Sequence, residues 1–559
     1  MKLADLHSVS ATVLISIVKR VLLTACILGT IAPVFAGGDS SVDILIRNAR
    51  IVDGTGSPWT RGDIAIADGR ILSIGHNLDI TAHRTIDAGD RFVAPGFIDV
   101  HVHVESVAGP WNDIYGIRSQ PMAENFLRDG VTTIVTGNCG NSEVDIAQFR
   151  SSLDKIGINV ATLIGHNAVR RSVMGIDDRE PTGDEMLAME ALVERAMSDG
   201  AVGLSTGLLY VPGRFAGTEE VTRLARVAAR HGGIYASHVR DQGARLAESV
   251  AEVARIARSA GIPAHVSHLK IKGRSRWGNI VETLEQIDRY RTEGLDITLD
   301  TYPYDRSSTG LSVLLPPWVL TGSHATVSER LADEDSRARI AAEMRQKLKD
   351  EGFADYSYAT VAGFVEDPAW VGKTIHDINL LLGNADTPDD EIGVILDLMA
   401  AAVDAGSRWG PPMVYRYMDM GDVETILRYE HTIIASDGEV FAFGKGLPHP
   451  RSYGTHARTI ARFVRNSPLY SIEEAVRRMT SAPARRVGFH DRGILNPGFA
   501  ADLVVFELDD VADTATFDNP HSYSTGFDYV IVNGVLVIDD GETTPRRPGR
   551  FITTRRSAP

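Results

Sequence analysis

An alternation of short apolar runs with longer amphipathic stretches constrains the fold of this chain most strongly. The apolar runs have strand length and cover residues 97–104, 131–136, 159–165, 201–205, 233–237, 263–267, 295–300 and 432–436. Between several of them lie segments with helical periodicity, at residues 183–199, 219–231 and 245–260. Such alternation predicts parallel strands joined by helical crossovers, and eight units predict a closed α/β barrel of the (β/α)8 TIM type over residues 96–495.

A long interval between the seventh and eighth runs interrupts this rhythm. Residues within about 305–430 lack the repeating pattern and contain helical patterns at residues 328–351 and 389–406. Long connections of this kind usually carry functional loops or covers. We therefore expect a helical insertion that lies over the site as a lid.

Both ends of the chain predict β structure instead. Residues 42–95 contain short alternating strands, with Asp53-Gly54 and Asp68-Gly69 as hairpin turns. Residues 496–553 have the same character. We expect the two ends to pair into one small β-sandwich beside the barrel.

Residues 1–36 predict an export signal. A basic pair, Lys19-Arg20, precedes an apolar run at residues 21–31, and the small residues at 34–36 fit a cleavage site. An uncleaved anchor is one alternative, and lipoprotein processing at Cys26 is another. We expect an exported protein, periplasmic or extracellular, without stable membrane insertion.

Charge and cysteine content exclude two features. The net charge is −16 and no basic cluster stands out, which argues against a nucleic-acid partner. The chain has two cysteines, Cys26 and Cys139, and removal of the signal leaves one, so no intramolecular disulfide can form. A metal thiolate at Cys139 would explain a lone thiol in an exported protein.

Metal-binding side chains stand at the C-terminal ends of the apolar runs. His101 and His103 lie two residues apart, so a strand would project both from one face. Later runs are followed by Cys139, His166, His238, His268 and Asp437. Because the C-terminal ends of barrel strands meet at one face, we expect these side chains to converge. Histidine, cysteine and carboxylate ligands together predict a zinc site.

Some of these residues suit more than one role. His166 fits a core position as well as one beside the site. His265 lies three residues before His268 and is predicted to face the other side of its strand as a structural residue. Asp437 is suited both to bind a metal and to accept a proton.

Several motifs resemble a known family. The segment Pro-Gly-Phe-Ile-Asp-x-His-x-His at residues 95–103, together with the predicted barrel and the terminal β segments, resembles the amidohydrolase superfamily. The segment Gly-Val-Thr-Thr-Ile-Val-Thr-Gly-Asn-Cys-Gly at residues 130–140 narrows the resemblance to the N-acyl-D-amino-acid deacylases, or D-aminoacylases. Shorter motifs at residues 207–212, 302–304, 448–451 and 453–455 are similar to the same family. The resemblance spans residues 42–540.

The resemblance implies a set of site residues. It implies a tight zinc held by Cys139, His238 and His268. It implies a second, weaker metal position at His101, His103 and Asp437, with the cysteine shared. It also implies substrate contacts by Tyr210, Lys270, Tyr302, Ser308 and Arg451. Arginine binds a carboxylate through a planar fork and lysine adds a point charge, so these cations suit an anionic small-molecule substrate.

The activity implied is zinc-dependent hydrolysis of the amide bond of N-acyl-D-amino acids, with Asp437 as the catalytic base. A cyclic-amide hydrolase of the hydantoinase or dihydroorotase type is one alternative. Those enzymes usually bridge two metals with a carboxylated lysine, and residues 204–206 offer no lysine. A non-catalytic exported binding protein is a second alternative, which predicts missing ligands. The sequence leaves the acyl group, the amino-acid side chain and the oligomeric state open.

Overall fold

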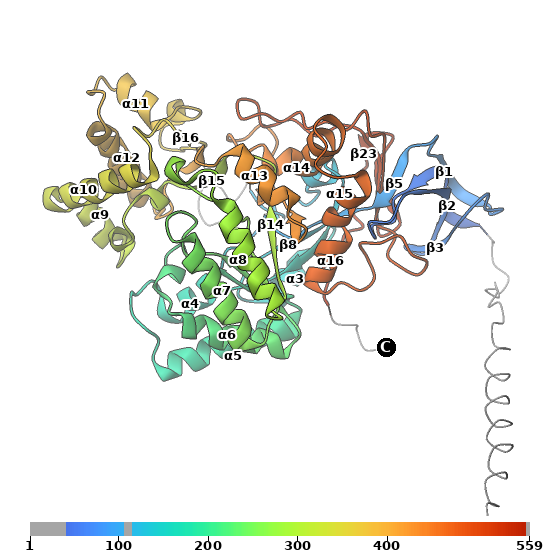
Figure 1. Cartoon of the computed structure of the whole chain (residues 1–559), viewed down its shortest axis with the longest axis horizontal. Coiled ribbons are helices and arrows are strands. Elements are labelled where there is room, and N and C mark those ends of the chain that lie inside the picture. The colour runs from blue at the N-terminus through green and yellow to red at the C-terminus, as the bar shows by residue number, and fades with distance from the viewer. Residues whose placement is uncertain (1–40, 106–114, 555–559) are drawn as a thin grey trace, which may run out of the picture.

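Figure 1 shows the computed structural model of the chain, which describes residues 41–105 and 115–554. The predicted export signal at residues 1–36, including Cys26, lies outside the described residues. Within the described ranges, no helix combines the length and the apolar character needed to cross a membrane.

The two ends of the chain share one mixed sheet of nine strands. Its N-terminal strands are β1 (Val42–Ile51), β2 (Thr60–Ala67), β3 (Arg70–Gly75), β4 (Ala82–Asp87) and β5 (Phe92–Pro95). Its C-terminal strands are β20 (Leu503–Phe506), β21 (Phe527–Val532), β22 (Val535–Asp539) and β23 (Glu542–Thr543). The two sets meet where β20 pairs antiparallel with β5, with Val504 opposite Ala94.

Each of the predicted apolar runs contains a strand, and these strands pair in parallel. One sheet holds β10 (Ile164–Gly165), β11 (Gly203–Gly207), β12 (Ile234–His238), β13 (Ala264–Val266), β14 (Ile297–Thr301) and β18 (Thr432–Ile434). A second holds β6 (Phe97–Asp99), β8 (Val131–Thr136) and β9 (Asn159–Thr162). A short pair joins β7 (Val102–His103) to β19 (Gly438–Glu439).

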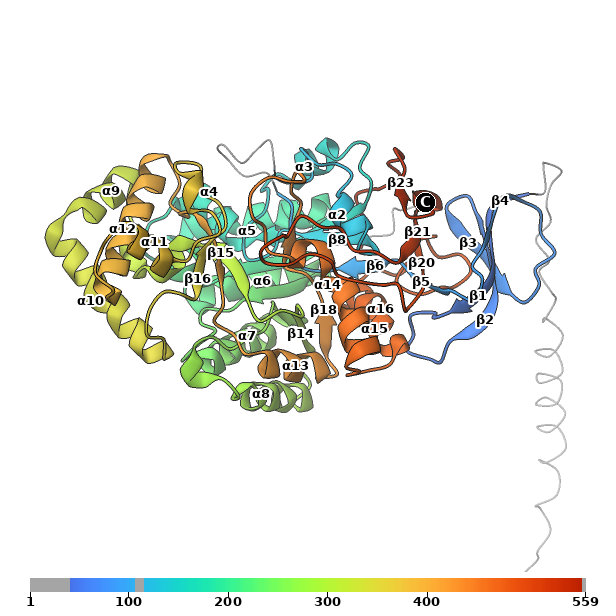
Figure 2. The same ribbon diagram turned by 90° about the horizontal axis from the view of Figure 1, so that it is seen from above.

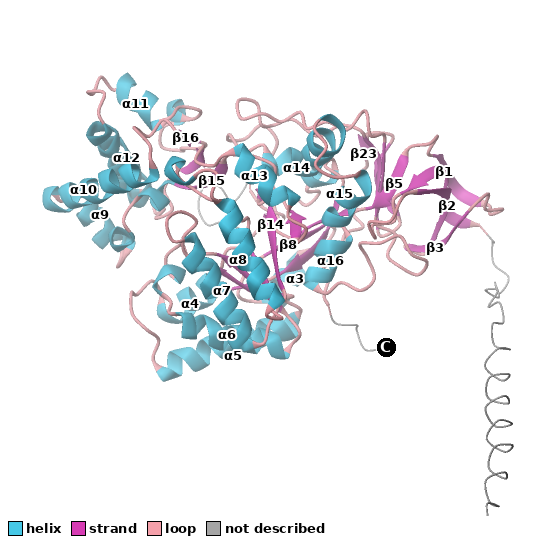
Figure 3. Cartoon of the chain, in the orientation of Figure 1, coloured by secondary structure: helices cyan, strands magenta, loops and turns pink. Residues whose placement is uncertain are grey.

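Helices lie between these strands, as the periodicity predicts (Figure 3). They include α4 (His166–Met174), α5 (Gly183–Asp199), α6 (Thr218–Arg230), α7 (Leu246–Ala260), α8 (Ile280–Thr292), α13 (Met420–Arg428), α14 (Arg451–Ile460), α15 (Ile472–Met479) and α16 (Ser481–Val487). Local signals set their ends. Helix α5 begins at a capping box of Thr182 and Glu185 and ends at Gly200, which adopts a left-handed conformation. Apolar faces of α5 to α8 pack on β11 to β14 in one core.

The insertion has its own core and lies at the opposite end of the molecule from β1 to β3 (Figure 2). It contains β15 (Ser307–Gly310), α9 (His324–Ala332), α10 (Glu334–Glu351), β16 (Ala359–Val361), α11 (Ile375–Leu381), α12 (Pro388–Asp404) and β17 (Pro412–Tyr415). The helical pattern at residues 328–351 forms two helices rather than one. Asp333 is extended there, and its side chain caps α10 by accepting a hydrogen bond from the backbone of Ser336.

Candidate metal centre

Three predicted ligands lie just after strands in a backbone conformation that is uncommon outside glycine. Cys139 follows β8 with φ 52°, His268 follows β13 with φ 33°, and Asp437 follows β18 with φ 52°. All three side chains are buried. Left-handed backbone at non-glycine residues is costly and is enriched at functional sites, which makes these three strand ends candidates for one.

The Cys139 thiol lies at the middle of the cluster. Its Sγ atom is 3.3 Å from Nε2 of His101 and 3.4 Å from Nε2 of His268. Nδ1 of His238 lies 3.5 Å from the same sulfur. The thiol thus meets a histidine from each of three other strand ends.

Asp437 completes the cluster. Its Oδ1 atom lies 3.1 Å from Nε2 of His103 and 3.4 Å from Nε2 of His101. The ligand atoms of His101, Cys139, His268 and Asp437 all lie within 4.8 Å of one another. His238 joins this group through the thiol and His103 through the carboxylate, so the structure brings all six predicted ligands together.

The spacing fits a zinc ion. On a tetrahedral zinc, a thiolate and an imidazole nitrogen lie about 3.6 Å apart, and a carboxylate oxygen and an imidazole nitrogen about 3.4 Å apart, given the usual bond lengths. The sulfur–nitrogen distances at Cys139 run from 3.3 to 3.5 Å. The distance from Asp437 to His101 is 3.4 Å. The donor set and its geometry therefore both suit zinc.

The electrostatics favour the metal-binding forms of two of these side chains. Burial opposes the thiolate of Cys139, yet the three facing histidines hold its pKa well below the ordinary value. Burial lowers the pKa of His238 to about 3, which keeps its ring neutral. Burial also opposes the imidazolium of His101, but the acidic groups around it raise its pKa to about 10.

Asp300 supports the cluster, and the sequence analysis did not predict this role. Its carboxylate accepts a hydrogen bond from the backbone of His268 at 2.8 Å, and lies 3.2 Å from Nδ1 of His101. A carboxylate behind a metal-binding histidine fixes its ring orientation and tautomer. His265, which we expected on the other side of its strand, shares this carboxylate through Nε2 at 2.7 Å. The sequence signal for this role was an aspartate in the apolar run at residues 295–300, where a charged residue is unusual.

Gln242 holds His268 from a loop. Its side-chain amide lies 3.2 Å from Nδ1 of His268, and the glutamine is buried. It follows β12 in a stretch without any periodic pattern, so no sequence signal identified it.

A cationic wall adjoins the metal cluster. Two cations lie near the Tyr302 ring: Nζ of Lys270 is 5.3 Å from the ring centroid and the guanidinium carbon of Arg451 is 4.8 Å from it. Lys270 donates to the carbonyl of His268 at 2.6 Å, and Nη1 of Arg451 lies 2.7 Å from Oδ2 of Asp437. Burial lowers the pKa of Lys270 to about 7. The Tyr302 hydroxyl makes no well-aligned hydrogen bond with the described residues. Such a wall suits an anionic group.

Tyr210 and Ser308 lie beside this wall. The Tyr210 ring packs edge-on against His238 at a centroid distance of 4.7 Å, and its hydroxyl lies 3.2 Å from Oγ1 of Thr309. Ser308 meets Arg451 through its backbone carbonyl, at 3.4 Å from Nη2. The first strand of the insertion therefore contributes to the site.

The structure also gives the positions of Tyr304, in the motif at residues 302–304, and of His166, which suited two roles. Tyr304 packs against His449 at a centroid distance of 5.3 Å and has Arg458 over its ring at 4.6 Å. Lys270 and Arg451, which contact the metal cluster, lie over the Tyr302 ring instead. His166 is buried, with Nε2 2.8 Å from Glu220. Glu220 also pairs with Arg170, so His166 belongs to a buried polar network rather than to the ligand cluster.

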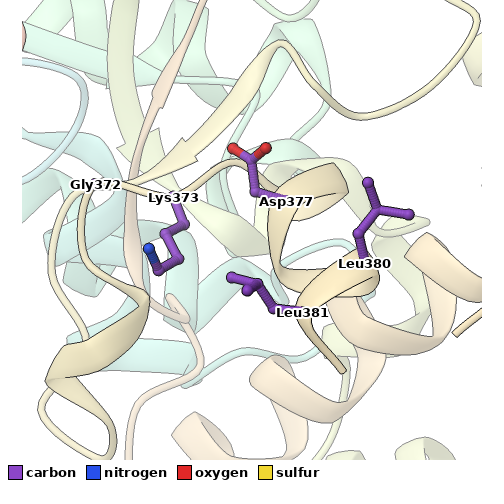
Figure 4. Close-up of a pocket in the computed structure, with 5 residues that line it drawn as sticks. All are labelled: Gly372, Lys373, Asp377, Leu380 and Leu381. Atoms are coloured by element: carbon purple, nitrogen blue, oxygen red, sulfur yellow. The ribbon is translucent and has the colours of Figure 1, made fainter. Parts of the chain in front are cut away.

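A surface pocket of about 430 Å³ lies on the insertion (Figure 4). Gly372, Lys373, Asp377, Leu380 and Leu381 line it. None of these is a predicted site residue, so the pocket is not the metal centre.

Comparisons with known proteins identify the family. A sequence profile described as the amidohydrolase family matches residues 84–366 and 398–538. The chain belongs to the amidohydrolase family. The N-acyl-D-glutamate deacylase of Alcaligenes xylosoxydans xylosoxydans is 34% identical over 542 residues, which cover 92% of this amidohydrolase and 97% of that protein. Membership of the N-acyl-D-amino-acid deacylase family, predicted from the motifs at residues 95–103 and 130–140, is confirmed.

Two solved structures resemble this amidohydrolase. A D-aminoacylase studied for its binuclear metal centre superposes with a TM-score of 0.75 at 29% identity, over 92% of this chain and 100% of that one. The second structure is the N-acyl-D-glutamate deacylase of Bordetella bronchiseptica, complexed with zinc and a phosphonate mimic of the tetrahedral intermediate. It superposes with a TM-score of 0.74 at 32% identity, over 91% of this chain and 99% of that one. The amidohydrolase-type fold therefore extends over nearly the whole chain.

Proposed function

We propose that this amidohydrolase hydrolyses the amide bond of N-acyl-D-amino acids and releases a carboxylate and a free D-amino acid. One observation carries the proposal: the metal cluster adjoins buried Lys270 and Arg451, which contact His268 and Asp437 directly. A metal site and a carboxylate-binding site this close suit a substrate whose amide and carboxylate share one carbon atom. The names of the relatives support the D configuration.

We infer that zinc is the metal. Cys139, His238 and His268 form the tight position, and His101, His103 and Asp437 form a weaker one that shares the thiol. A thiolate among imidazoles favours zinc over harder cations, and the zinc complex and binuclear centre of the relatives support both positions. When bound, the metal supplies Lewis-acid polarisation of the acyl carbonyl and of the attacking water.

The protein's own residues move the proton and hold the substrate. Asp437 accepts the proton of the water at Oδ1, the oxygen that faces His101 and His103, and returns it to the leaving amine. Arg451 and Lys270 bind the α-carboxylate, with the Tyr302 hydroxyl between them. Tyr210 and Ser308 line the space in which the substrate binds.

We infer that the parallel strands close into a single eight-stranded barrel. Pairing of β19 with β7, with Gly438 opposite Val102, brings the last unit beside the first. Apolar side chains of β6, β8, β9, β12 and β18 also share one buried cluster. On this basis residues 96–495 form the barrel with a lid within about 305–430, and residues 42–95 and 496–553 form the terminal β domain.

We also propose that residues 1–36 direct export of the chain to the periplasm or beyond, and that the substrate is its small-molecule partner. The basic pair ahead of the apolar run supports this proposal. N-terminal sequencing of the secreted protein should start at Gly37. A start at Cys26 would instead indicate lipoprotein processing.

The test of the proposed activity combines amine release from N-acetyl-D-amino acids with metal analysis. Chelator treatment should abolish turnover and zinc should restore it. The D437N variant should keep zinc at the tight position and lose turnover by about 10³-fold, whereas D397N on the exposed face of α12 should match the wild type. Full activity of the metal-free protein would refute the proposal. Loss of all zinc from D437N would make Asp437 a structural ligand instead of a base.

A further inference from the structure

The Asn167 side chain lies where three segments of the site meet. It is the second residue of α4 and is fully buried. Its Oδ1 atom accepts a hydrogen bond from the backbone of Gly207 at 3.2 Å, and its Nδ2 donates to the carbonyl of the same residue at 3.0 Å. Nδ2 also lies within 3.4 Å of the carbonyl of Tyr210. Strand β10 stops pairing with β11 at Gly165. Two residues later, the Asn167 amide makes the hydrogen bonds to the end of β11 that a neighbouring strand would make.

Glycines from two of these segments pack their bare backbone against the Asn167 amide. A Cβ atom at Gly140 would lie 2.2 Å from Oδ1 of Asn167, and one at Gly213 would lie 2.4 Å from the same atom. A Cβ at Gly207 would lie 2.1 Å from the carbonyl oxygen of Cys139. Contacts this short leave no room for a side chain unless the neighbouring atoms move, so glycine allows the three segments to close on one amide.

Two of these segments carry site residues. Gly140 adjoins Cys139, and its carbonyl accepts a hydrogen bond from the backbone of Ala168 in the same turn of α4. Tyr210 packs against His238, a predicted ligand. The Asn167 amide is hydrogen-bonded to the Tyr210 loop and packs against Gly140 of the thiol-bearing turn, so one side chain contacts both segments.

We propose that Asn167 is a positioning residue that fixes the Cys139 turn and the Tyr210 loop relative to each other. It thereby sets metal affinity and substrate binding at the same time. The substrate half of this inference rests on the proposed function. Only a side-chain amide of this length offers an acceptor to Gly207 N–H and donors to two carbonyls; aspartate would place a charge against both carbonyls.

The test compares two variants with two matched controls. N167D removes the donors, and G213A keeps Asn167 but pushes its amide away; Gly213 does not have positive φ, so alanine is tolerated by the backbone. N379D alters another fully buried amide, in α11, and G217A adds a methyl group where no atom lies within 4 Å. Tight-zinc affinity by chelator competition, KM, kcat and Tm are measured for each.

We expect N167D to weaken zinc binding by about 10- to 100-fold and to raise KM, with kcat/KM falling by about 100-fold. G213A should shift both quantities in the same direction and carries the test if N167D does not fold. N379D should lower Tm alone, and G217A should change nothing. The inference is overturned if N167D or G213A lowers Tm but leaves zinc affinity and KM at wild-type values. If the wild type hydrolyses no N-acyl-D-amino acid, the proposed function fails. The zinc affinity of N167D and G213A still tests the role of Asn167: weaker binding than in the wild type supports it, and unchanged binding refutes it.

Discussion

Nη1 of Arg451 lies 2.7 Å from Oδ2 of Asp437, and both side chains are buried. Burial by itself would raise the pKa of this carboxyl, but Arg451 and the neighbouring histidines hold it well below its ordinary value. In our proposal, Asp437 is the base and Arg451 binds the substrate carboxylate. The arginine therefore links substrate recognition to the base through one direct contact.

The R451M variant should lose recognition of the α-carboxylate. Removing one partner of a buried charge pair costs about 2–5 kcal/mol, so KM for an N-acyl-D-amino acid should rise by about 100-fold. The matching carboxamide substrate lacks the charge, so its KM should change much less, whereas kcat should fall for both substrates because Asp437 loses its partner. R416M, at an arginine whose side chain is 67% exposed, is the control. An unchanged preference for the acid over the carboxamide in R451M would contradict the assignment.

Asp300 should be needed for tight metal binding. The D300N variant removes the charge that orients His101 and His265; if its oxygen still accepts from the backbone of His268, its NH2 group faces the two rings. We expect metal affinity to fall by about 10- to 100-fold, measured by competition with a chelator. D397N at an exposed aspartate of α12 should keep wild-type affinity. Equal affinities in the two variants would show that Asp300 serves folding alone.

His376 should make the stability of the insertion depend on pH. Its Nδ1 atom lies 2.6 Å from Oε1 of Glu391, and this hydrogen bond raises the pKa of the histidine above 6.5. A raised pKa in the folded state stabilises the protein fully below the unfolded value, and the gain is lost as pH rises through the folded value. H376Q should therefore lower Tm at about pH 5.5 and have little effect at about pH 9. H324Q, at an exposed histidine of α9, is the control. An equal loss of Tm at both pH values would exclude the ionic contribution.

The contact between the terminal sheet and the parallel strands should depend on Asp502. This buried carboxylate pairs with Arg492 and accepts hydrogen bonds from Asn159 of β9 and from the backbone of Asn533. Breaking a buried pair leaves the partner charge unpaired and typically costs about 3–5 kcal/mol. D502N should lower the free energy of unfolding by that order in denaturant titration, while D509N on the surface should not. A smaller loss, similar to that of D509N, would mean that the apolar core alone holds the two parts together.

The sequence predicted the strand ends of the site well, for a physical reason. His101 lies in the last half of the first apolar run, Cys139, His238, His268 and Asp437 each follow a later one, and parallel strands necessarily end at one edge. A site residue at a strand end can therefore be predicted from its position in the strand–helix repeat. Membership of the family followed from motifs at the same ends.

The supporting residues could not be found in the same way. Gln242 and Asn167 act through contacts with loops and turns, where no periodicity specifies direction. Asp300 is the last residue of the seventh apolar run, but its role depends on partners from other strands, which the run itself does not specify. The orientation of His265 was wrong because strand alternation failed at His268, whose φ of 33° ends the extended conformation there. Likewise, the split between α9 and α10 depends on the single extended residue Asp333.

The most direct test of the central claim is the kcat/KM of the zinc-loaded protein for matched N-acetyl-D- and N-acetyl-L-amino acids, followed by release of the free amine. We predict efficient hydrolysis of D substrates, dependent on zinc and on a free α-carboxylate, and negligible hydrolysis of their L enantiomers. Amine release from L substrates alone, or from neither enantiomer while zinc remains bound, would contradict the proposed function.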